Sequence, residues 1–318
     1  MRYLVRVLIC SCFLTPLANA VRIPPLAPRL MNSTFRIEGT NAEGKTATGT
    51  CFILTRPMRY NTNAGWNVLV TATHVLSDMA GDEARLFLRL AQSNGTYSKL
   101  ETKIRIRDGG KPLWYRHPEV DVAAMILPLP QEFIGQHDWL PESLLAGDDR
   151  FREREITAGD ELMCLGYPLG LESNPAGFPI LRSGRIASFP VTPSTVAKSF
   201  LFDIPVYGGN SGGPVFFDFR KRQIPGDESS NWVDAVGIAG VISQDVSQVL
   251  KVEGYFETIT RRDPLGLAVV IPAEFIKQAV DQLIKQQESD AQPDGPANGS
   301  QPVRSETNRP SSAAGSRR

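Results

Sequence analysis

Histidine and cysteine are both scarce in this chain, which has three histidines and four cysteines among 318 residues. The histidines are scattered along the chain and no H-E-x-x-H pattern occurs, so the usual ligand sets for zinc are missing. Neither a P-loop nor a dinucleotide fingerprint is present. The sequence therefore predicts no metal site and no cofactor.

Net charge and long apolar runs are lacking as well. The 34 Lys and Arg residues balance the 34 Asp and Glu residues, so no global field would steer the protein to nucleic acid or to an anionic membrane. No stretch after the first twenty residues reaches the roughly 20 apolar residues that a membrane span needs. We expect a partner selected by shape, no nucleic acid and no membrane span; the oligomeric state is left open.

The first twenty residues are typical of a secretory signal. Two arginines give a positively charged start, residues 8–17 are mostly apolar, and residues 18–20 read Ala-Asn-Ala, which suits signal peptidase. An arginine at position 6 makes the apolar run too short for a membrane anchor. A lipoprotein signal ending at one of the two early cysteines is a poorer alternative, because little apolar sequence precedes them. We expect residues 1–20 to be removed and the chain to be exported, to a periplasm or to the outside.

Two cysteines, Cys51 and Cys164, would remain after this cleavage. In an oxidising compartment they could pair. They fall in different halves of the chain, so two separate buried thiols are an equally good interpretation, and the sequence leaves both open.

Short apolar runs separated by Gly, Asn, Asp and Pro fill residues 34–128, and a second series follows after residue 160. The run at 85–90 alternates strictly, as a half-buried strand should. Without long helical periods between them, such strands indicate a sandwich or barrel. The predicted strands are 35–37, 51–54, 68–70, 85–90, 120–127, 161–165, 180–187, 199–204, 214–217, 236–242 and 267–271.

The remaining segments divide the chain. Residues 131–157 break the strand rhythm, and the charged run 148–155 predicts a solvated connection between two halves. Residues 273–287 carry apolar side chains on one face and predict an amphipathic helix. From residue 288 the composition is polar and rich in Pro, Gly and Ser, which is typical of disorder. We expect domains at 21–135 and 136–287, followed by a disordered tail at 288–318.

Residues 208–214 read Gly-Gly-Asn-Ser-Gly-Gly-Pro. The hydroxyl of Ser211, placed between glycines, is sterically exposed, and glycine lets the chain turn sharply with its amide hydrogens facing one point. Such amides can bind the oxyanion that forms when a hydroxyl attacks a carbonyl. A glycine-rich turn without catalysis is the alternative that this motif alone leaves open.

Chain order decides which kind of serine enzyme is possible, because a serine needs a base that is itself held by a third group. His74, His117 and His137 all precede Ser211, which excludes the Ser-acid-His order of α/β-hydrolases. No aspartate precedes His74, which excludes the subtilisin order. His74 follows the predicted strand 68–70, whereas we expect His117 and His137 to be surface histidines. The base is therefore predicted to be His74.

Asp121 is the one charge in the apolar stretch 120–127. A carboxylate in such a strand is costly unless it is paired, and holding the N–H of an imidazole is such a pairing. A strand-end aspartate facing water is the alternative. Other aspartates lie in polar turns and have no comparable reason to face a base: Asp78, Asp82, Asp108 and Asp160.

These segments resemble the three signatures of trypsin-like (chymotrypsin-fold) serine peptidases: T-A-T-H-V at 71–75, D-V-A-A-M at 121–125 and G-N-S-G-G-P at 209–214. Within that group the chain is similar to bacterial Deg/Htr-type proteases, through Asn210, Asp203 and the Val-Ile-Pro strand end at 270–272. The resemblance implies an all-β fold of two six-stranded antiparallel β-barrels with a C-terminal helix and a catalytic cleft between the barrels.

The resemblance also implies roles for single residues. The amides of Gly209 and Ser211 would form the oxyanion hole, and Ser243 and Gln244 would lie beside the substrate backbone. The position that gives trypsin its basic specificity is Pro205, which argues against Lys or Arg substrates and for a small or medium apolar side chain.

Some departures from the family pattern matter. Asn210 stands where digestive members carry an aspartate, so no zymogen ion pair is expected, and Asp203 is interpreted as a structural carboxylate. The ordered sequence ends near residue 287, which leaves no room for a PDZ domain. The sequence thus predicts an exported serine endopeptidase acting on protein or peptide substrates. A catalytically silent binding or chaperone-like protein and an esterase are the alternatives.

Overall fold

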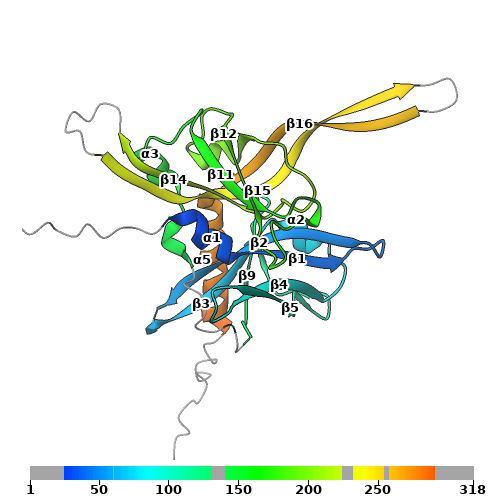
Figure 1. Cartoon of the computed structure of the whole chain (residues 1–318), viewed down its shortest axis with the longest axis vertical. Helices are drawn as coiled ribbons and strands as arrows, with labels where there is room; N and C mark the ends of the chain where they lie inside the picture. Colours follow the sequence, from blue (N-terminus) through cyan, green and yellow to red (C-terminus); the bar gives the residue numbers. More distant parts are fainter. Residues whose placement is uncertain are drawn as a thin grey trace, which may run out of the picture.

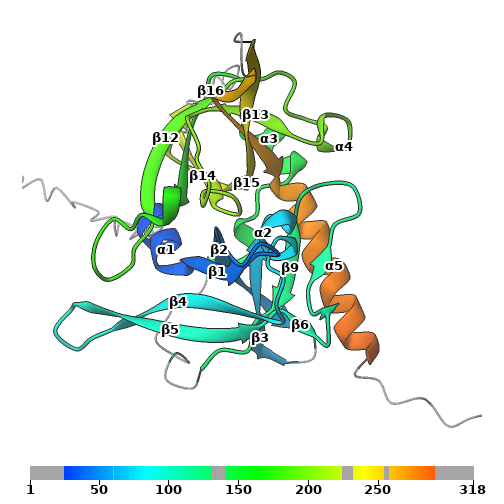
Figure 2. The same ribbon diagram turned by 90° about the vertical axis from the view of Figure 1, so that its right-hand side faces the viewer.

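The computed structural model describes residues 25–59, 61–130, 133, 140–223, 232–253 and 258–290. The predicted signal at 1–20, His137 and all but the start of the predicted tail lie outside these residues. Two β-rich halves stack on each other, and helix α5 runs along one side of both (Figures 1 and 2). None of the described helices is long and apolar enough to cross a membrane.

The N-terminal half is an eight-stranded sheet in the order β5-β4-β1-β2-β3-β9-β8, with β10 added in parallel to β2. The structure gives a sheet with more strands than the six-stranded barrel expected here, because β10, which lies within the predicted connecting segment 131–157, pairs with β2, and β8 adds an edge strand next to β9. The elements are α1 (Leu26–Ser33), β1 (Thr34–Thr40), β2 (Thr46–Met58), β3 (Asn61–Thr71), α2 (Thr73–Ser77), β4 (Glu83–Ala91), β5 (Tyr97–Arg105), β6 (Arg107–Asp108), β7 (Lys111–Pro112), β8 (Tyr115–Arg116), β9 (Ala123–Ile126) and β10 (Leu140–Pro141).

The C-terminal half is a closed six-stranded barrel, β11-β12-β13-β16-β15-β14, as predicted. Strands β15 and β16 run far beyond the expected ranges because they continue as a paired hairpin that projects from the barrel (Figure 1). The elements are η2 (Glu142–Leu144), α3 (Asp148–Glu153), β11 (Glu161–Gly166), η3 (Pro168–Gly170), β12 (Ile180–Ile186), α4 (Ser194–Ala197), β13 (Phe200–Asp203), β14 (Pro214–Gln223), β15 (Trp232–Glu253), β16 (Thr258–Pro272) and α5 (Ala273–Asp290).

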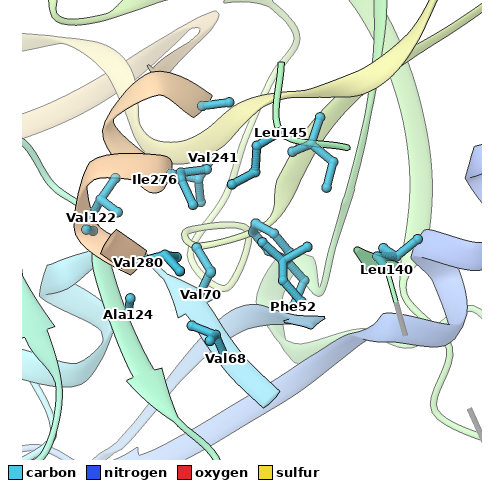
Figure 3. Close-up of a cluster of buried hydrophobic side chains, with 14 of the residues drawn as sticks. Phe52, Val68, Val70, Val122, Ala124, Leu140, Leu145, Val241, Ile276 and Val280 are labelled. Carbon is cyan, nitrogen blue, oxygen red and sulfur yellow. The ribbon is translucent and has the colours of Figure 1, made fainter. Parts of the chain in front are cut away.

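One of three buried apolar clusters joins the two halves. Each half has its own buried cluster, and a third lies where strands of both halves meet α5 (Figure 3). In this third cluster, Val70 and Phe52 of the first half pack with Val241 of the second and with Ile276 and Val280 of the helix. Burying a side chain of this size contributes about 1.5–3 kcal/mol, so α5 fixes how the halves sit against each other.

The connector and the cysteines also have a definite place. Part of the charged run predicted as a solvated connection forms helix α3, and Phe151 within it is buried against the second half. Cys51 and Cys164 are both free and buried, which agrees with the interpretation of two separate thiols. Burial raises the pKa of the Cys164 thiol to about 12 and raises that of Cys51 as well.

Candidate active site

His74 lies in the first turn of α2, just after the buried end of β3. The sequence predicted a position at the end of a strand, and the strand indeed ends at Thr71, three residues earlier. Because β3 is held between β2 and β9, the short helix that follows it has a fixed origin. The imidazole is 40% exposed, so one side of it is open to solvent.

The sequence predicted that Asp121 lies inside a strand, and this prediction is wrong. Asp121 lies in a bend before β9. The ladder between β3 and β9 begins only at Ala123, because the amide of Val122 turns back to the carbonyl of Val120. The carboxylate of Asp121 is 26% exposed and accepts hydrogen bonds from His74. Its Oδ2 lies 2.7 Å from His74 Nδ1, and its Oδ1 accepts the His74 backbone amide at 3.0 Å.

A third donor completes the surroundings of this carboxylate. The hydroxyl of Ser243 donates to Asp121 Oδ2 at 2.6 Å. Burial by itself would raise the pKa of Asp121, but the hydrogen bonds from His74 and Ser243 and the charge of His74 outweigh it and lower that pKa. Asp121 is therefore ionised at neutral pH and only accepts hydrogen bonds.

The ionised carboxylate determines the tautomer of His74. Since Asp121 Oδ2 can only accept, the proton of neutral His74 lies on Nδ1, and Nε2 carries the free lone pair. Burial works to lower the pKa of His74, yet the hydrogen bond and charge of Asp121, together with the charge of Asp78, raise it above the ordinary value of 6.5. The ring is thus oriented as a base whose strength is increased.

Ser211 lies in the glycine-rich loop between β13 and β14. Its backbone carbonyl accepts the amide of Thr50 at 2.9 Å, which ties the loop to the first half. Its hydroxyl donates to the backbone carbonyl of Ser243 at 2.9 Å. Within the part of the chain that the structure describes, no hydrogen bond joins this hydroxyl to His74, although both residues line the same cavity.

Glycine is required at two positions of this loop. Gly209 and Gly212 have φ of +96° and +86°, a region that other residues rarely adopt. A Cβ on Gly212 would lie 2.0 Å from the carbonyl oxygen of Thr50, and one on Gly209 would lie 2.2 Å from that of Tyr167. The repeated glycines of the sequence motif therefore reflect close packing of the loop against neighbouring backbone.

The peptide between Gly208 and Gly209 has a definite orientation. Its carbonyl oxygen accepts the amide of Leu169 at 2.7 Å. Because a trans peptide points its N–H opposite to its C=O, the Gly209 amide faces away from Leu169. Among the described residues, the amides of Gly209 and Ser211 have no hydrogen-bond acceptor. Two amides are thus available to bind an oxygen.

A cavity of 680 Å³ between the halves is lined by His74, Asp121 and Ser211, and by Gly208 next to Gly209. Ser243 and Gln244 line it, whereas Pro205 does not; Val206 lies in the lining in its place. The carbonyl of Pro205 instead accepts a hydrogen bond from Arg182. Pro205 is exposed and Val206 is buried, so the chain turns towards the cavity only after Pro205.

Sequence reasoning missed an ion pair at the rim of the cavity. Lys198 Nζ lies 2.9 Å from Glu119 Oε2, and the two residues come from opposite halves. Lys198 and the hydrogen bond to it lower the pKa of Glu119. No local pattern could have signalled this pair, because its members are separated by 79 positions and meet only in the folded chain.

His117 was expected at the surface, and the structure corrects this. Its side chain is buried, with Nε2 3.1 Å from Gln278 Oε1 and the ring edge-on to Phe275. Helix α5 covers the loop that carries it, and no local pattern signals that packing. His117 is therefore a packing residue between the first half and α5.

Comparison with protein families decides the affiliation. A trypsin-like peptidase domain matches residues 49–223, which is more than half of the chain. The chain belongs to the trypsin-like peptidase family. The chymotrypsin-like fold and a proteolytic function follow from this membership, as does a protein substrate. No metal-binding group of His, Cys, Asp or Glu occurs among the described residues of this trypsin-like peptidase.

Solved structures of similar fold include three proteases or protease relatives. The protease Anisep from Arthrobacter nicotinovorans is 14% identical with a TM-score of 0.44, and the match covers 80% of this chain and 96% of that one. Deg5 is 20% identical with a TM-score of 0.45, covering 81% and 92%. A scabies mite inactivated protease paralogue is 15% identical with a TM-score of 0.45, covering 81% and 96%. At this level of similarity the matches do not bear on activity, and comparison with curated proteins gives no match.

Proposed function

We propose that this trypsin-like peptidase is a serine endopeptidase in which Ser211 is the nucleophile, His74 the general base and Asp121 the residue that orients the base. The observation that carries the proposal is the chain of short contacts in one cavity. Asp121 Oδ2 lies 2.7 Å from His74 Nδ1 and accepts Ser243 Oγ at 2.6 Å, and the carbonyl of Ser243 holds the Ser211 hydroxyl.

In the proposed reaction, the Ser211 hydroxyl rotates from the Ser243 carbonyl towards His74 Nε2. Nε2 takes the hydroxyl proton as Oγ attacks the substrate carbonyl carbon, and the amides of Gly209 and Ser211 stabilise the resulting oxyanion. The imidazolium then gives its proton to the leaving amine, and an ester to Ser211 remains. Water gives a proton to His74 as it attacks this ester; the imidazolium then returns that proton to Ser211 Oγ as the acyl–oxygen bond breaks, and the acid product leaves.

A fluorophosphonate probe tests the proposal directly. We expect the purified protein to be labelled stoichiometrically, and Ser211→Ala to abolish labelling and peptide hydrolysis while leaving the melting temperature nearly unchanged. Ser199→Ala is a matched control, because Ser199 lines the same cavity. Hydrolysis that survives in Ser211→Ala, or labelling of that variant, would disprove the assignment.

A second candidate is a binding protein that keeps the fold and does not turn over substrate. The observation that favours it is the hydrogen bond from the Ser211 hydroxyl to the Ser243 carbonyl and not to His74. Hydrogen bonds of catalytic groups often form only in the substrate complex, so we favour the enzyme. A folded protein that binds peptides but never reacts with the probe would support the second candidate.

We also propose that the enzyme is exported. The support is the sequence of residues 1–20, with its basic start, apolar centre and Ala-Asn-Ala end. Expression of the full chain with mass spectrometry of the secreted product should find an N-terminus at residue 21. A product retaining Met1 inside the cell would contradict export.

A further inference from the structure

Arg89 is fully buried, although the alternating run 85–90 predicted a half-buried strand. Its guanidinium donates to five groups from two distant segments. Nη2 donates to the carbonyls of Met31, Asn32 and Thr34 at 2.8, 3.2 and 2.6 Å, at the end of helix α1. Nη1 donates to the carbonyl of Gly177 at 2.8 Å and to the hydroxyl of Tyr167 at 3.1 Å. Arg89 therefore joins the N-terminal segment to the loop that follows β11.

The surroundings of Arg89 hold this cation in one place. Its guanidinium carbon lies 4.4 Å from the centre of the Phe35 ring and 4.6 Å from that of Phe178, distances typical of cation–π contacts. Carbonyls at a helix C-terminus carry partial negative charge, which compensates the buried charge. Burial of a guanidinium is costly without such partners, so the loss of any one of them disturbs the whole arrangement.

Tyr167 extends this arrangement towards the active site. The residue is fully buried, and burial raises its pKa to about 12, so its hydroxyl keeps a proton to donate. On the opposite side, its backbone amide donates to Thr50 Oγ1 at 3.2 Å, and that hydroxyl donates to the Gly209 carbonyl at 2.6 Å. Two hydrogen bonds thus connect the Tyr167 backbone to Gly209, one of the two residues whose backbone amides have no acceptor among the described residues.

The turn after Tyr167 sets the peptide orientation. Leu169 has φ of +54°, a strained conformation for a residue with a side chain. In this conformation its amide donates to the Gly208 carbonyl, which is the contact that directs the Gly209 amide away from the turn. A strained residue persists only where its surroundings hold it, and Arg89 binds the loop at Tyr167 and at Gly177, on both sides of Leu169.

We propose that Arg89 and Tyr167 are positioning residues for the oxyanion hole. Together with the end of helix α1, they hold the turn that orients the Gly208–Gly209 peptide, so that the Gly209 amide is available to the transition state. In this way the buried cation of Arg89 orders the catalytic loop. The ion pair that an aspartate at position 210 would make is therefore not needed to order it. The inference rests on the proposed function, and it names the residues that keep the oxyanion hole of that site rigid.

The test compares five variants of the full protein, the fifth being the conservative substitution Arg89→Lys. Arg89→Met and Tyr167→Phe remove the cation and the hydroxyl. Arg85→Met is a matched control on the same strand, where Arg85 pairs with Glu38 instead. Tyr97→Phe is the matched control for Tyr167→Phe, because it also removes one phenol hydroxyl. The ring of Tyr97 contacts Phe178 edge-on, and this ring contact would be retained in the variant.

We expect Arg89→Met to lower kcat about 100-fold, as a displacement of the oxyanion site of the order of 1 Å would. Tyr167→Phe should lower kcat about fivefold, the effect of one hydrogen bond. In both variants KM should change less than about twofold, because only transition-state binding is affected. A peptide aldehyde, whose adduct places an oxyanion in the hole, should lose affinity in proportion to kcat. Arg89→Lys should recover part of the loss.

The outcomes separate this inference from the proposed function. If the wild type neither hydrolyses peptides nor reacts at Ser211, both fail. If the wild type is active and Tyr167→Phe has the kcat and aldehyde affinity of Tyr97→Phe, the inference alone is overturned. An equal loss in Arg85→Met and Arg89→Met would also overturn it. Should Arg89→Met fail to fold, Tyr167→Phe, in which only one oxygen is removed, decides between the outcomes.

Discussion

The substitution Asp121→Asn tests how the site controls the proton of its histidine. Asparagine offers one carbonyl oxygen and one NH₂ group where the carboxylate offers two acceptors. The backbone amide of His74 is a fixed donor to Oδ1 at 3.0 Å, so the carbonyl oxygen must take that position. The NH₂ group then faces His74 Nδ1 and the Ser243 hydroxyl, and that hydroxyl can turn to accept.

Every hydrogen bond is therefore satisfied in this variant, but only if His74 carries its proton on Nε2. That nitrogen then faces the cavity as a donor and cannot take a proton from Ser211. We expect kcat to fall about 10⁴-fold, as in the template triad. Stability should fall by only about 1 kcal/mol, since charged hydrogen bonds are replaced by neutral ones.

Steady-state kinetics on a peptide substrate and thermal unfolding measure the two effects. Asp78→Asn is the matched control, because the exposed side chain of Asp78 acts on His74 through its charge, and its backbone hydrogen bond to the His74 carbonyl is kept in the variant; the kcat of this variant should change by less than about threefold. If Asp121→Asn kept more than a tenth of wild-type kcat, the tautomer argument would be refuted. A loss of the folded state in that variant would refute the claim that all hydrogen bonds are satisfied.

Further predictions concern pH, the glycine loop and the thiols. The value of kcat/KM should fall as pH is lowered, with a midpoint above 6.5, because His74, whose pKa is raised, must be neutral to accept a proton; a midpoint below 6 would contradict this. Gly212→Ala, whose Cβ would lie 2.0 Å from Thr50 O, should destabilise the protein by about 2 kcal/mol or more and lower its melting temperature by several degrees. Cys51 and Cys164 should resist iodoacetamide at pH 8 in the folded protein, because burial raises the pKa of both thiols; rapid alkylation of the native chain would argue against their burial.

Much of the fold was predictable because strands leave a local pattern. The runs at 51–54 and 68–70 lie within β2 and β3, and each run of the second half overlaps one strand of the closed barrel, although 180–187 and 199–204 extend past the ends of β12 and β13. The apolar face of residues 273–287 is buried in α5 as expected. Alternation and amphipathic periodicity depend only on which side chains leave water, so a single chain records them.

The candidate site was partly predictable for another reason. The order of three scarce histidines relative to Ser211 left one arrangement, and the structure brings His74 and Asp121 into a hydrogen bond. The same reasoning placed Asp121 inside a strand and Pro205 against the pocket, and the structure places neither there. Strand ends and turns depend on hydrogen bonds to distant residues, which a local pattern does not contain.

By itself, the sequence determined most of the long strands, the closing helix and which chemically capable residues could be combined, because these follow from side-chain type, spacing and order. Tertiary structure alone decided that Arg89 is buried, that Tyr167 touches both Arg89 and the loop of Ser211, and that Lys198 meets Glu119 across the cavity. These contacts join residues that are far apart in the chain, and their energies come from desolvation and geometry that exist only once the two halves have packed.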